Sequence, residues 1–317
     1  MQRVSLRRGR DISGAWRVTG PLCRSIYILI MSGEPCRGQL LTPNYDRFRQ
    51  GALLLISFLS LFAAPVGVAG AAGPHVTVEL IAEQTAVQPA RPFWVGLHFQ
   101  LENGWHIYWT NPGDSGEPPR VKWNLPAAFQ AGPLQWPAPR RIEDHSLIDY
   151  GYLHEVLLPV EIRPAGGGSE VQLNATVKWL VCREICVPGH ADLELTLPMR
   201  MGMAGPPSST HSLFAKARAD MPRPAPKSWR VSATLDQHRF VLNVDTGKRE
   251  IGATFFPLEP NQIENAAPQE AIPLSGGIQL EIQKSDQLLK GPAHLPGVLV
   301  FASGQGYVIE APVTTSK

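Results

Sequence analysis

The stretch that decides the fold is residues 171–197, VQLNATVKWLVCREICVPGHADLELTL. Apolar and polar residues alternate over 171–181 and again over 191–197, which is the period of a β-strand with one buried face. Between these runs lie Cys182 and Cys186, followed by a Val-Pro-Gly segment that breaks the pattern. The stretch predicts two antiparallel strands joined by a tight turn, which brings the two cysteines close enough for a disulfide.

Similar short apolar runs, separated by Pro and Gly, fill the chain from residue 75 to residue 197. They predict further strands at Val76–Ala82, Phe93–Leu101, Val121–Leu125 and Val156–Ile162. Turns are expected at Asn111-Pro112-Gly113, at Pro118-Pro119 and, as a hairpin turn, at Gly166-Gly167-Gly168. Many short strands without a long helical run predict an antiparallel β-sandwich.

After residue 200 the composition changes. Residues 201–229 are rich in Pro and predict a linker, with a short helix at Ser212–Asp220 that has Leu213, Phe214 and Ala217 along one side. Consecutive X-Pro pairs exclude helix from residues 221–226. A second β region follows, with strands expected near 230–235, 240–244, 252–256, 278–282, 297–302 and 307–311.

Composition agrees with an all-β protein. The 317 residues include 29 Gly and 30 Pro, and 44% are hydrophobic, which suits many turns between buried strands. We therefore expect a first β-sandwich domain at 72–200 and a second at 230–317, each large enough for its own core. A net charge of +2 is too small to indicate a nucleic-acid partner.

Residues 1–71 are predicted to be a leader. Arg47 and Arg49 precede an apolar run at 51–64, and small residues follow, which is the order of a secretory signal peptide cleaved near Ala71. The apolar run is shorter than the roughly 20 residues that span a bilayer, so we expect cleavage, with an uncleaved membrane anchor as the alternative. Met31 is an alternative start of the chain.

The two close cysteines allow three interpretations. A structural disulfide across so short a loop stabilises by only about 2 kcal/mol in the loop-entropy model, which disfavours a purely structural role. A redox-active pair suits an exported protein with an exposed hairpin tip. A metal site would use Cys182, Cys186 and His190, because thiolate and imidazole suit Cu(I) or Zn. The residues alone favour the redox pair and leave the other two open.

Aromatic residues are frequent around these strands. Trp105, Tyr108 and Trp109 are most simply packed in the core or at its edge, and Tyr150 and Tyr152 suit a packed hairpin. Asp144, His145 and Ser146 are adjacent in sequence, so their side chains diverge and predict no catalytic triad.

Several strings together resemble the periplasmic N-terminal region of the DsbD superfamily, and within it the ScsB-like branch, named for suppression of copper sensitivity. They are GWHIYWTNPGDSG at 104–116, QWPAP at 135–139, YGY at 150–152, VLLP at 156–159 and WLVC at 179–182. The similarity covers most of 75–312, including FFP at 255–257 and GVLV at 297–300.

The resemblance implies two immunoglobulin-like β-sandwich domains and a cysteine pair that passes electrons from a transmembrane domain to thioredoxin-fold proteins. Such acceptors include disulfide isomerases and cytochrome c maturation factors. Cys182 and Cys186 are then the redox pair, with Cys186 as the sulfur attacked by partners, and Tyr150, Tyr152 and Trp179 as candidates to shield it. No organic cofactor or metal is implied.

The sequence departs from the full pattern of that family. It contains no polytopic membrane domain and no C-terminal thioredoxin domain, so a separate transmembrane thiol-disulfide reductase is expected as the electron donor, unless the chain is a truncated form. Autonomous protein-disulfide reductase activity is left open. The competing hypothesis is a periplasmic copper-binding or copper-tolerance protein that uses Cys182, Cys186 and His190.

Overall fold

The structure is a computed structural model of the 317-residue chain and describes residues 70–144 and 146–315. The predicted leader, with its alternative as a membrane anchor, lies outside these residues except for Gly70 and Ala71. Within the described ranges, no helix combines the length and the apolar character needed to cross a bilayer. The described residues all belong to one compact unit.

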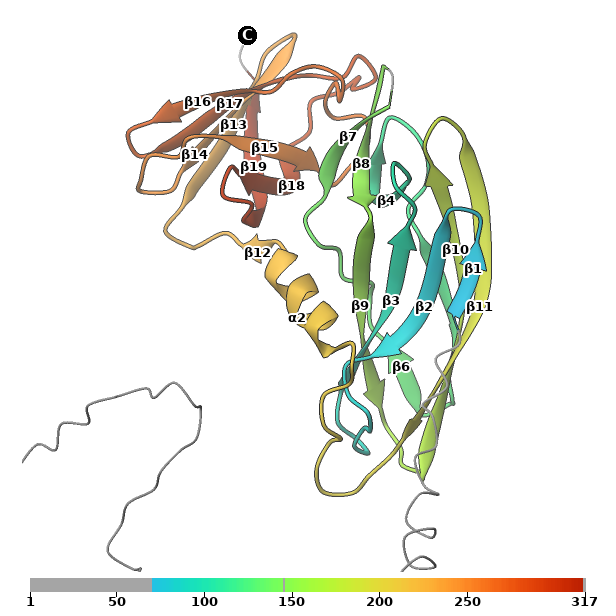
Figure 1. Cartoon of the computed structure of the whole chain (residues 1–317). Coiled ribbons are helices and arrows are strands. Elements are labelled where there is room, and N and C mark those ends of the chain that lie inside the picture. The colour runs from blue at the N-terminus through green and yellow to red at the C-terminus, as the bar shows by residue number, and fades with distance from the viewer. Residues whose placement is uncertain (1–69, 145, 316–317) are drawn as a thin grey trace, which may run out of the picture. The chain divides into compact units, whose positions relative to one another are not determined.

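The first domain consists of two antiparallel sheets (Figure 1). The five-stranded sheet has the order β1 (Gly70–Gly73), β2 (Val76–Ala82), β3 (Phe93–Leu101), β9 (Glu155–Pro164) and β6 (Phe129–Ala131). The six-stranded sheet has the order β11 (Cys186–Pro198), β10 (Glu170–Cys182), β4 (His106–Gly113), β8 (Leu147–Leu153) and β7 (Arg140–Asp144), and β5 (Arg120–Asn124) pairs with β10.

Alternating residues of both sheets form one core. Every second side chain of β10 is buried, as the alternation over 171–181 predicts, because successive residues of a strand point to opposite faces. The core includes Leu80, Leu97 and Leu158 from one sheet and Leu173, Val177 and Leu195 from the other. Burial of each such side chain contributes about 1.5–3 kcal/mol. The predicted antiparallel β-sandwich is confirmed.

The hairpin of β10 and β11 is longer than predicted. The Val-Pro-Gly segment, expected to break the strand, is part of β11, and Pro188 and Gly189 pair with Leu180 and Trp179. Two features explain the difference. Strand β11 lies at the end of its sheet, where the missing N–H of Pro188 leaves no partner strand unpaired. A Cβ on Gly189 would overlap the ring of Trp179, so the glycine makes room for that ring.

Two predicted turns are also wrong. Asn111-Pro112-Gly113 lies inside β4, whose register against β8 shifts between Tyr108 and Gly113, and Gly113 takes a φ of 92°. The turn-forming residues are therefore accommodated within the strand as a β-bulge. The glycines at 166–168 connect β9 to β10, which lie in different sheets, so the segment crosses between layers and is not a hairpin turn.

The second domain contains eight strands and its own core. Their order is β15 (Ala253–Pro257), β18 (His294–Phe301), β19 (Gly306–Thr315), β13 (Arg230–Leu235), β14 (Arg239–Asp245), β17 (Gly277–Gln283) and β16 (Glu270–Leu274), with β12 (Arg223–Pro224) beside β19. Strand β19 pairs antiparallel with β18 and then, from Val313, parallel with β13, so it joins the two halves of the domain. These parallel pairs and β16 had no signal in the sequence.

Helix α2 (His211–Asp220) confirms the short helix predicted in the linker. Phe214 and Ala217 are buried against Ile81 and Leu157 of the five-stranded sheet. The helix lies beside β9 of that sheet (Figure 1). Arg218 near the end of the helix forms an ion pair with Glu83. The helix ends before Pro222, as the restriction on residues preceding proline requires. This part of the predicted linker is therefore attached to the first domain.

Candidate functional site

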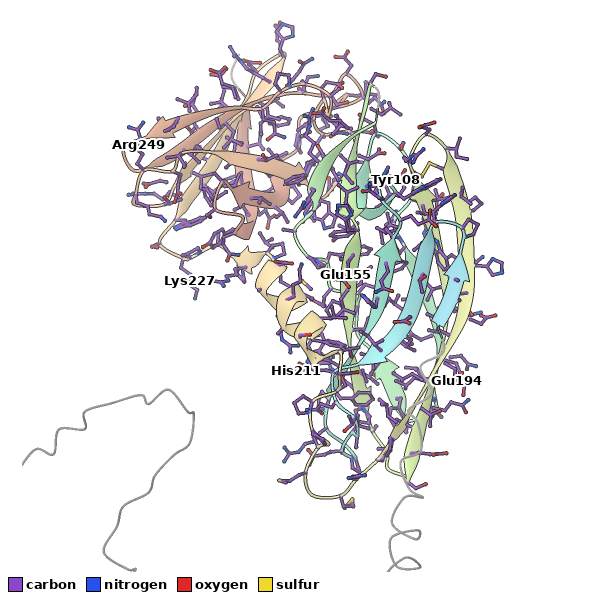
Figure 2. All side chains as sticks on the ribbon, in the orientation of Figure 1. Tyr108, Glu155, Glu194, His211, Lys227 and Arg249 are labelled. Carbon is purple, nitrogen blue, oxygen red and sulfur yellow. A yellow bond between two sulfur atoms is a disulfide. The ribbon has the colours of Figure 1, made fainter. Side chains whose placement is uncertain are left out.

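A disulfide joins the two strands of the longest hairpin at its tip. Cys182 is the last residue of β10 and Cys186 the first of β11; they are cross-strand partners with Cα atoms 4.2 Å apart. The turn is closed by the Arg183 N–H, which donates to the Ile185 carbonyl over 3.2 Å. The tight turn expected from the sequence does bring the two sulfur atoms together (Figure 2).

The two cysteines differ in their access to solvent. Cys182 is 1% exposed, whereas Cys186 belongs to the exposed residues, as do the three turn residues between them. Ile185 in this turn is 66% exposed. Thiol exchange requires a sulfur that an incoming thiolate can reach, and of the two cysteines Cys186 is the exposed one.

Stacked side chains pack against one side of the turn. The guanidinium carbon of Arg183 lies 5.8 Å from the centre of the Trp105 ring, on which the His75 ring is stacked at 3.7 Å. His75 in turn pairs with Glu102 through Nδ1 at 2.7 Å. Cation–π and stacking contacts of this kind contribute modestly at exposed sites, about 0.5–1 kcal/mol. They fix one side of the turn to the start of β2 and β4.

Tyr108 is the polar neighbour of the exposed cysteine (Figure 2). The Tyr108 hydroxyl lies 3.5 Å from the Sγ of Cys186 and 3.3 Å from the hydroxyl of Ser115, while its ring is fully buried. Gly116, with a φ of 74°, lies directly against this ring, and a Cβ at that position would overlap it. Glycine is required there by both the close approach and the backbone conformation.

A buried carboxylate continues the network. Asp149 is 1% exposed and accepts hydrogen bonds from the hydroxyl of Ser115 at 3.0 Å and from its backbone N–H at 3.1 Å. Nε2 of His106, a side chain that is 2% exposed, lies 3.2 Å from Asp149 Oδ2. His106 is also the β4 residue that pairs with Cys182. Buried charged groups need such partners, since an unpaired one is costly.

The three aromatic residues predicted to shield the disulfide have other described contacts. Tyr150 donates from its hydroxyl to Asn265 Oδ1 at 2.7 Å, and Tyr152 donates to the Pro137 carbonyl at 2.7 Å. Burial raises the pKa of both tyrosines. Trp179 packs edge-on against Phe99 in the core. Their shielding role stays a prediction.

The predicted metal ligands do not converge. The sulfur atoms of Cys182 and Cys186 bond to each other, and His190 is an exposed residue of β11 opposite Lys178. In the part of the chain that the structure describes, no group of three His, Cys, Asp or Glu side chains is placed to hold a metal ion.

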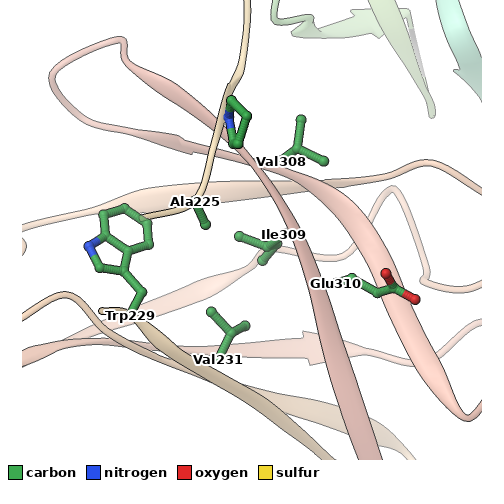
Figure 3. Close-up of a pocket in the computed structure, with 7 residues that line it drawn as sticks. Ala225, Trp229, Val231, Val308, Ile309 and Glu310 are labelled. Carbon is green, nitrogen blue, oxygen red and sulfur yellow. The ribbon is translucent and has the colours of Figure 1, made fainter. Parts of the chain in front are cut away.

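Sequence reasoning missed four residues around the disulfide: His106, Tyr108, Ser115 and Asp149. All but Asp149 lie in the 104–116 string that carries the family resemblance, but their closeness to the cysteines depends on long-range strand pairing. Tyr108 is buried, as expected for a core aromatic, and its hydroxyl also reaches the sulfur. A hollow of about 570 Å³ is lined by Trp229, Ile309 and Glu310 of the second domain, and none of its lining residues belongs to this network (Figure 3).

Comparisons with known proteins agree with this architecture. Residues 77–198 match the family model described as "Thiol:disulfide interchange protein DsbD, N-terminal". The crystal structure of the N-terminal periplasmic domain of ScsB from Proteus mirabilis superposes with a TM-score of 0.61 at 17% identity, covering 78% of this chain and 98% of that one. This likeness concerns the fold, and it extends over both domains.

A second solved structure, the periplasmic chaperone SfaE, matches with a TM-score of 0.19 at 12% identity, covering 75% of this chain and all of that one. That score is too low to bear on the fold. No curated protein sequence matches the chain.

Proposed function

We propose that this chain, whose residues 77–198 form a DsbD/ScsB-like N-terminal domain, is a periplasmic thiol–disulfide exchange module that works through Cys182 and Cys186. The observation that carries the proposal is the hairpin-tip disulfide between one buried and one exposed cysteine. A bond that only stabilised the fold would gain nothing from an open sulfur beside a buried hydrogen-bond network.

The exchange takes two steps in each direction. A donor thiolate attacks the exposed Cys186 sulfur, forms a mixed disulfide and releases Cys182 as a thiolate. The donor's second thiolate then attacks the donor sulfur of the mixed disulfide. This step leaves the donor oxidised and releases Cys186 as a thiolate. The reduced cysteines then pass their electrons to the acceptor. Cys186 attacks the acceptor disulfide and forms a mixed disulfide. Cys182 attacks the Cys186 sulfur, re-forms the Cys182–Cys186 disulfide and releases the reduced acceptor. Two electrons pass from donor to acceptor.

Tyr108 supplies a hydrogen-bond donor for the Cys186 thiolate. A hydroxyl that donates to an anionic sulfur favours the thiolate over the thiol, and the thiolate is the form that attacks disulfides. Ser115 and Asp149 hold this hydroxyl in place through the contacts described above. We therefore assign Tyr108 a direct role at the sulfur and Ser115 a positioning role.

The proposed partners follow from the family likeness. A separate transmembrane thiol-disulfide reductase serves as the electron donor, and periplasmic thioredoxin-fold proteins are the acceptors. A signal peptide within residues 1–71 delivers the chain to that compartment. No specific observation favours the copper-binding alternative.

Trapping tests the proposal. With Cys182→Ala, Cys186 should attack an acceptor disulfide and remain joined to it, because no resolving thiolate is left. Non-reducing electrophoresis and mass spectrometry of the full chain expressed in cells should recover a thioredoxin-fold partner. Cys186→Ala is the matched control and should trap nothing. Failure of the Cys182 variant to form any covalent partner would contradict the exchange role.

A further inference from the structure

We propose that the second domain positions the redox site, with Asn265 as the positioning residue. It acts on residues 114–116, named here the site loop, which places Ser115 against the hydroxyl and Gly116 against the ring of Tyr108. The inference deepens the proposed function, on which its biological meaning rests. It gives the second domain a part in controlling Cys186.

Residues of strand β4 contact both the disulfide and the second domain. Tyr108 reaches Cys186, while the next residue, Trp109, meets Phe256 edge-on with ring centres 6.4 Å apart. Asn111 is 3% exposed and donates from Nδ2 to the Pro257 carbonyl at 2.8 Å. Tyr108 and Trp109 are adjacent, and adjacent residues of a strand point to opposite faces, so this strand contacts both the sulfur and the second domain.

The site loop is tied to the second domain through Asn265. The Nδ2 of Asn265 donates to Asp114 Oδ1 at 2.8 Å, and its Oδ1 accepts from the Tyr150 hydroxyl at 2.7 Å. Asp114 Oδ2 accepts from the N–H of Ile148 at 2.7 Å, and the N–H of Asp114 donates to the Ile148 carbonyl at 2.9 Å. One amide thus joins the loop and β8, the strand that carries Asp149.

Asp114 is the direct neighbour of Ser115, whose N–H and hydroxyl both bond to Asp149. Two residues further on, Gly116 lies against the Tyr108 ring. A displacement of Asp114 therefore moves the two contacts that define the position of the Tyr108 hydroxyl. The path from Asn265 to the Cys186 sulfur consists of bonded neighbours at every step.

The contact between the domains is part of a packed core. Phe256 is 3% exposed and also lies edge-on to Tyr150, with ring centres 5.1 Å apart. Together with Val298 it belongs to the hydrophobic cluster of the first domain. Arg141 of β7 adds hydrogen bonds to the carbonyls of Asn265 and Ala266, each at 3.1 Å. These contacts hold the second domain against the first and thereby fix the position of Asn265 relative to the site loop.

Alkylation of reduced Cys186 measures the positioning without any partner. In the full chain carrying Cys182→Ala, the rate of iodoacetamide addition to the Cys186 peptide is followed by mass spectrometry at neutral pH. Asn265→Ala should slow this rate about fivefold, the factor that corresponds to one net hydrogen bond. Its pH profile should move to higher pH, because less thiolate is present. Gln237→Ala, which removes an exposed amide of the same domain, is the matched control and should change neither.

Two further variants separate positioning from a loss of folding. Asn265→Asp places a carboxylate opposite Asp114 and should slow alkylation more than Asn265→Ala does. Adding Asp114→Asn to that variant restores an amide–carboxylate pair with reversed polarity, and the rate should return to within about twofold of the parent, well inside the effect of one hydrogen bond. Circular dichroism checks the fold of each chain. An alkylation rate in both single Asn265 variants equal to that of Gln237→Ala overturns the inference.

A double-mutant cycle tests the route. In a Tyr108→Phe background, Asn265→Ala should have no further effect on alkylation, because the hydroxyl through which it acts is gone. Additive effects would show that Asn265 does not act through Tyr108 and would overturn the inference. Partner trapping by Cys182→Ala depends only on the proposed function, so failure of the exchange role and failure of the positioning role give different results.

Discussion

The Tyr108 hydroxyl lies 3.5 Å from the Cys186 sulfur and 3.3 Å from the Ser115 hydroxyl, so a single buried side chain joins the disulfide to the Asp149–His106 pair. This relationship makes the local chemistry of Cys186 depend on residues that are distant in sequence. Tyr108 contacts the sulfur directly, whereas Ser115, Asp149 and His106 act on it through Tyr108.

Replacing Tyr108 with Phe should slow the reaction of Cys186 while leaving the fold intact. The ring that packs against Gly116 remains, but the donor to the thiolate is lost, so we expect alkylation of reduced Cys186 to slow about fivefold at neutral pH. Tyr307→Phe, which alters a half-buried tyrosine of the second domain, serves as the control. Equal alkylation rates in the two variants would exclude a role for the Tyr108 hydroxyl.

Asp149→Ala should cost more stability than any other single polar change at the site. It leaves the buried His106 ring and the Ser115 hydroxyl without their shared acceptor, and breaking such a buried pair costs about 3–5 kcal/mol. Asp149→Asn keeps an acceptor oxygen for Ser115 and should cost less. Denaturant unfolding measures both, and an order opposite to this one would contradict the network.

Gly116→Ala should destabilise the protein more than a glycine substitution with the same backbone requirement. Gly116 has a φ of 74°, and its Cβ would overlap the Tyr108 ring. Gly304 has a φ of 85°, and a Cβ added there would meet no atom within 4 Å, so Gly304→Ala reports the backbone penalty alone, about 1 kcal/mol. The difference between the two unfolding free energies measures the overlap, and no difference would rule it out.

Alkaline solution should destabilise the fold through Tyr150 and Tyr152. Burial raises the pKa of both groups in the folded state, whereas the unfolded chain loses these protons near pH 10. Above that pH the unfolded state binds fewer protons than the folded state, so the unfolding free energy falls as pH rises. Below pH 10 the contribution is fully present. Unfolding curves from pH 8 to 11 in the parent and in a Tyr150→Phe/Tyr152→Phe chain test this, and the double variant should lose less stability.

Local pattern was enough to predict most of the strands. Alternation predicted Phe93–Leu101 and Arg230–Leu235 with the bounds that the structure has, because one face of each of these strands contributes to a core. The pattern gave wrong predictions where proline or glycine, which usually mark turns, occur inside a strand. Pro188 lies in an edge strand, and Gly113 lies in a bulge, so turn-forming residues occur within regular pairing.

The cysteines of the site were evident from sequence, but their surroundings were not. Cys182 and Cys186 are four positions apart, and any tight turn brings them together. Asp149 approaches Ser115 only because β4 and β8 pair, and Asn265 approaches Asp114 only because the second domain packs on the first. Contacts of that kind depend on register and domain packing, for which a single sequence carries no periodic signal.

The place of β11 at the end of its sheet has a consequence for solubility. An open strand edge invites pairing with a foreign strand, and here that edge begins at the exposed Cys186. Pro188 removes one backbone donor from it, and the exposed carboxylates of Asp192 and Glu194 add negative charge along its length. These residues discourage strand-by-strand aggregation at this edge while the hairpin tip stays exposed.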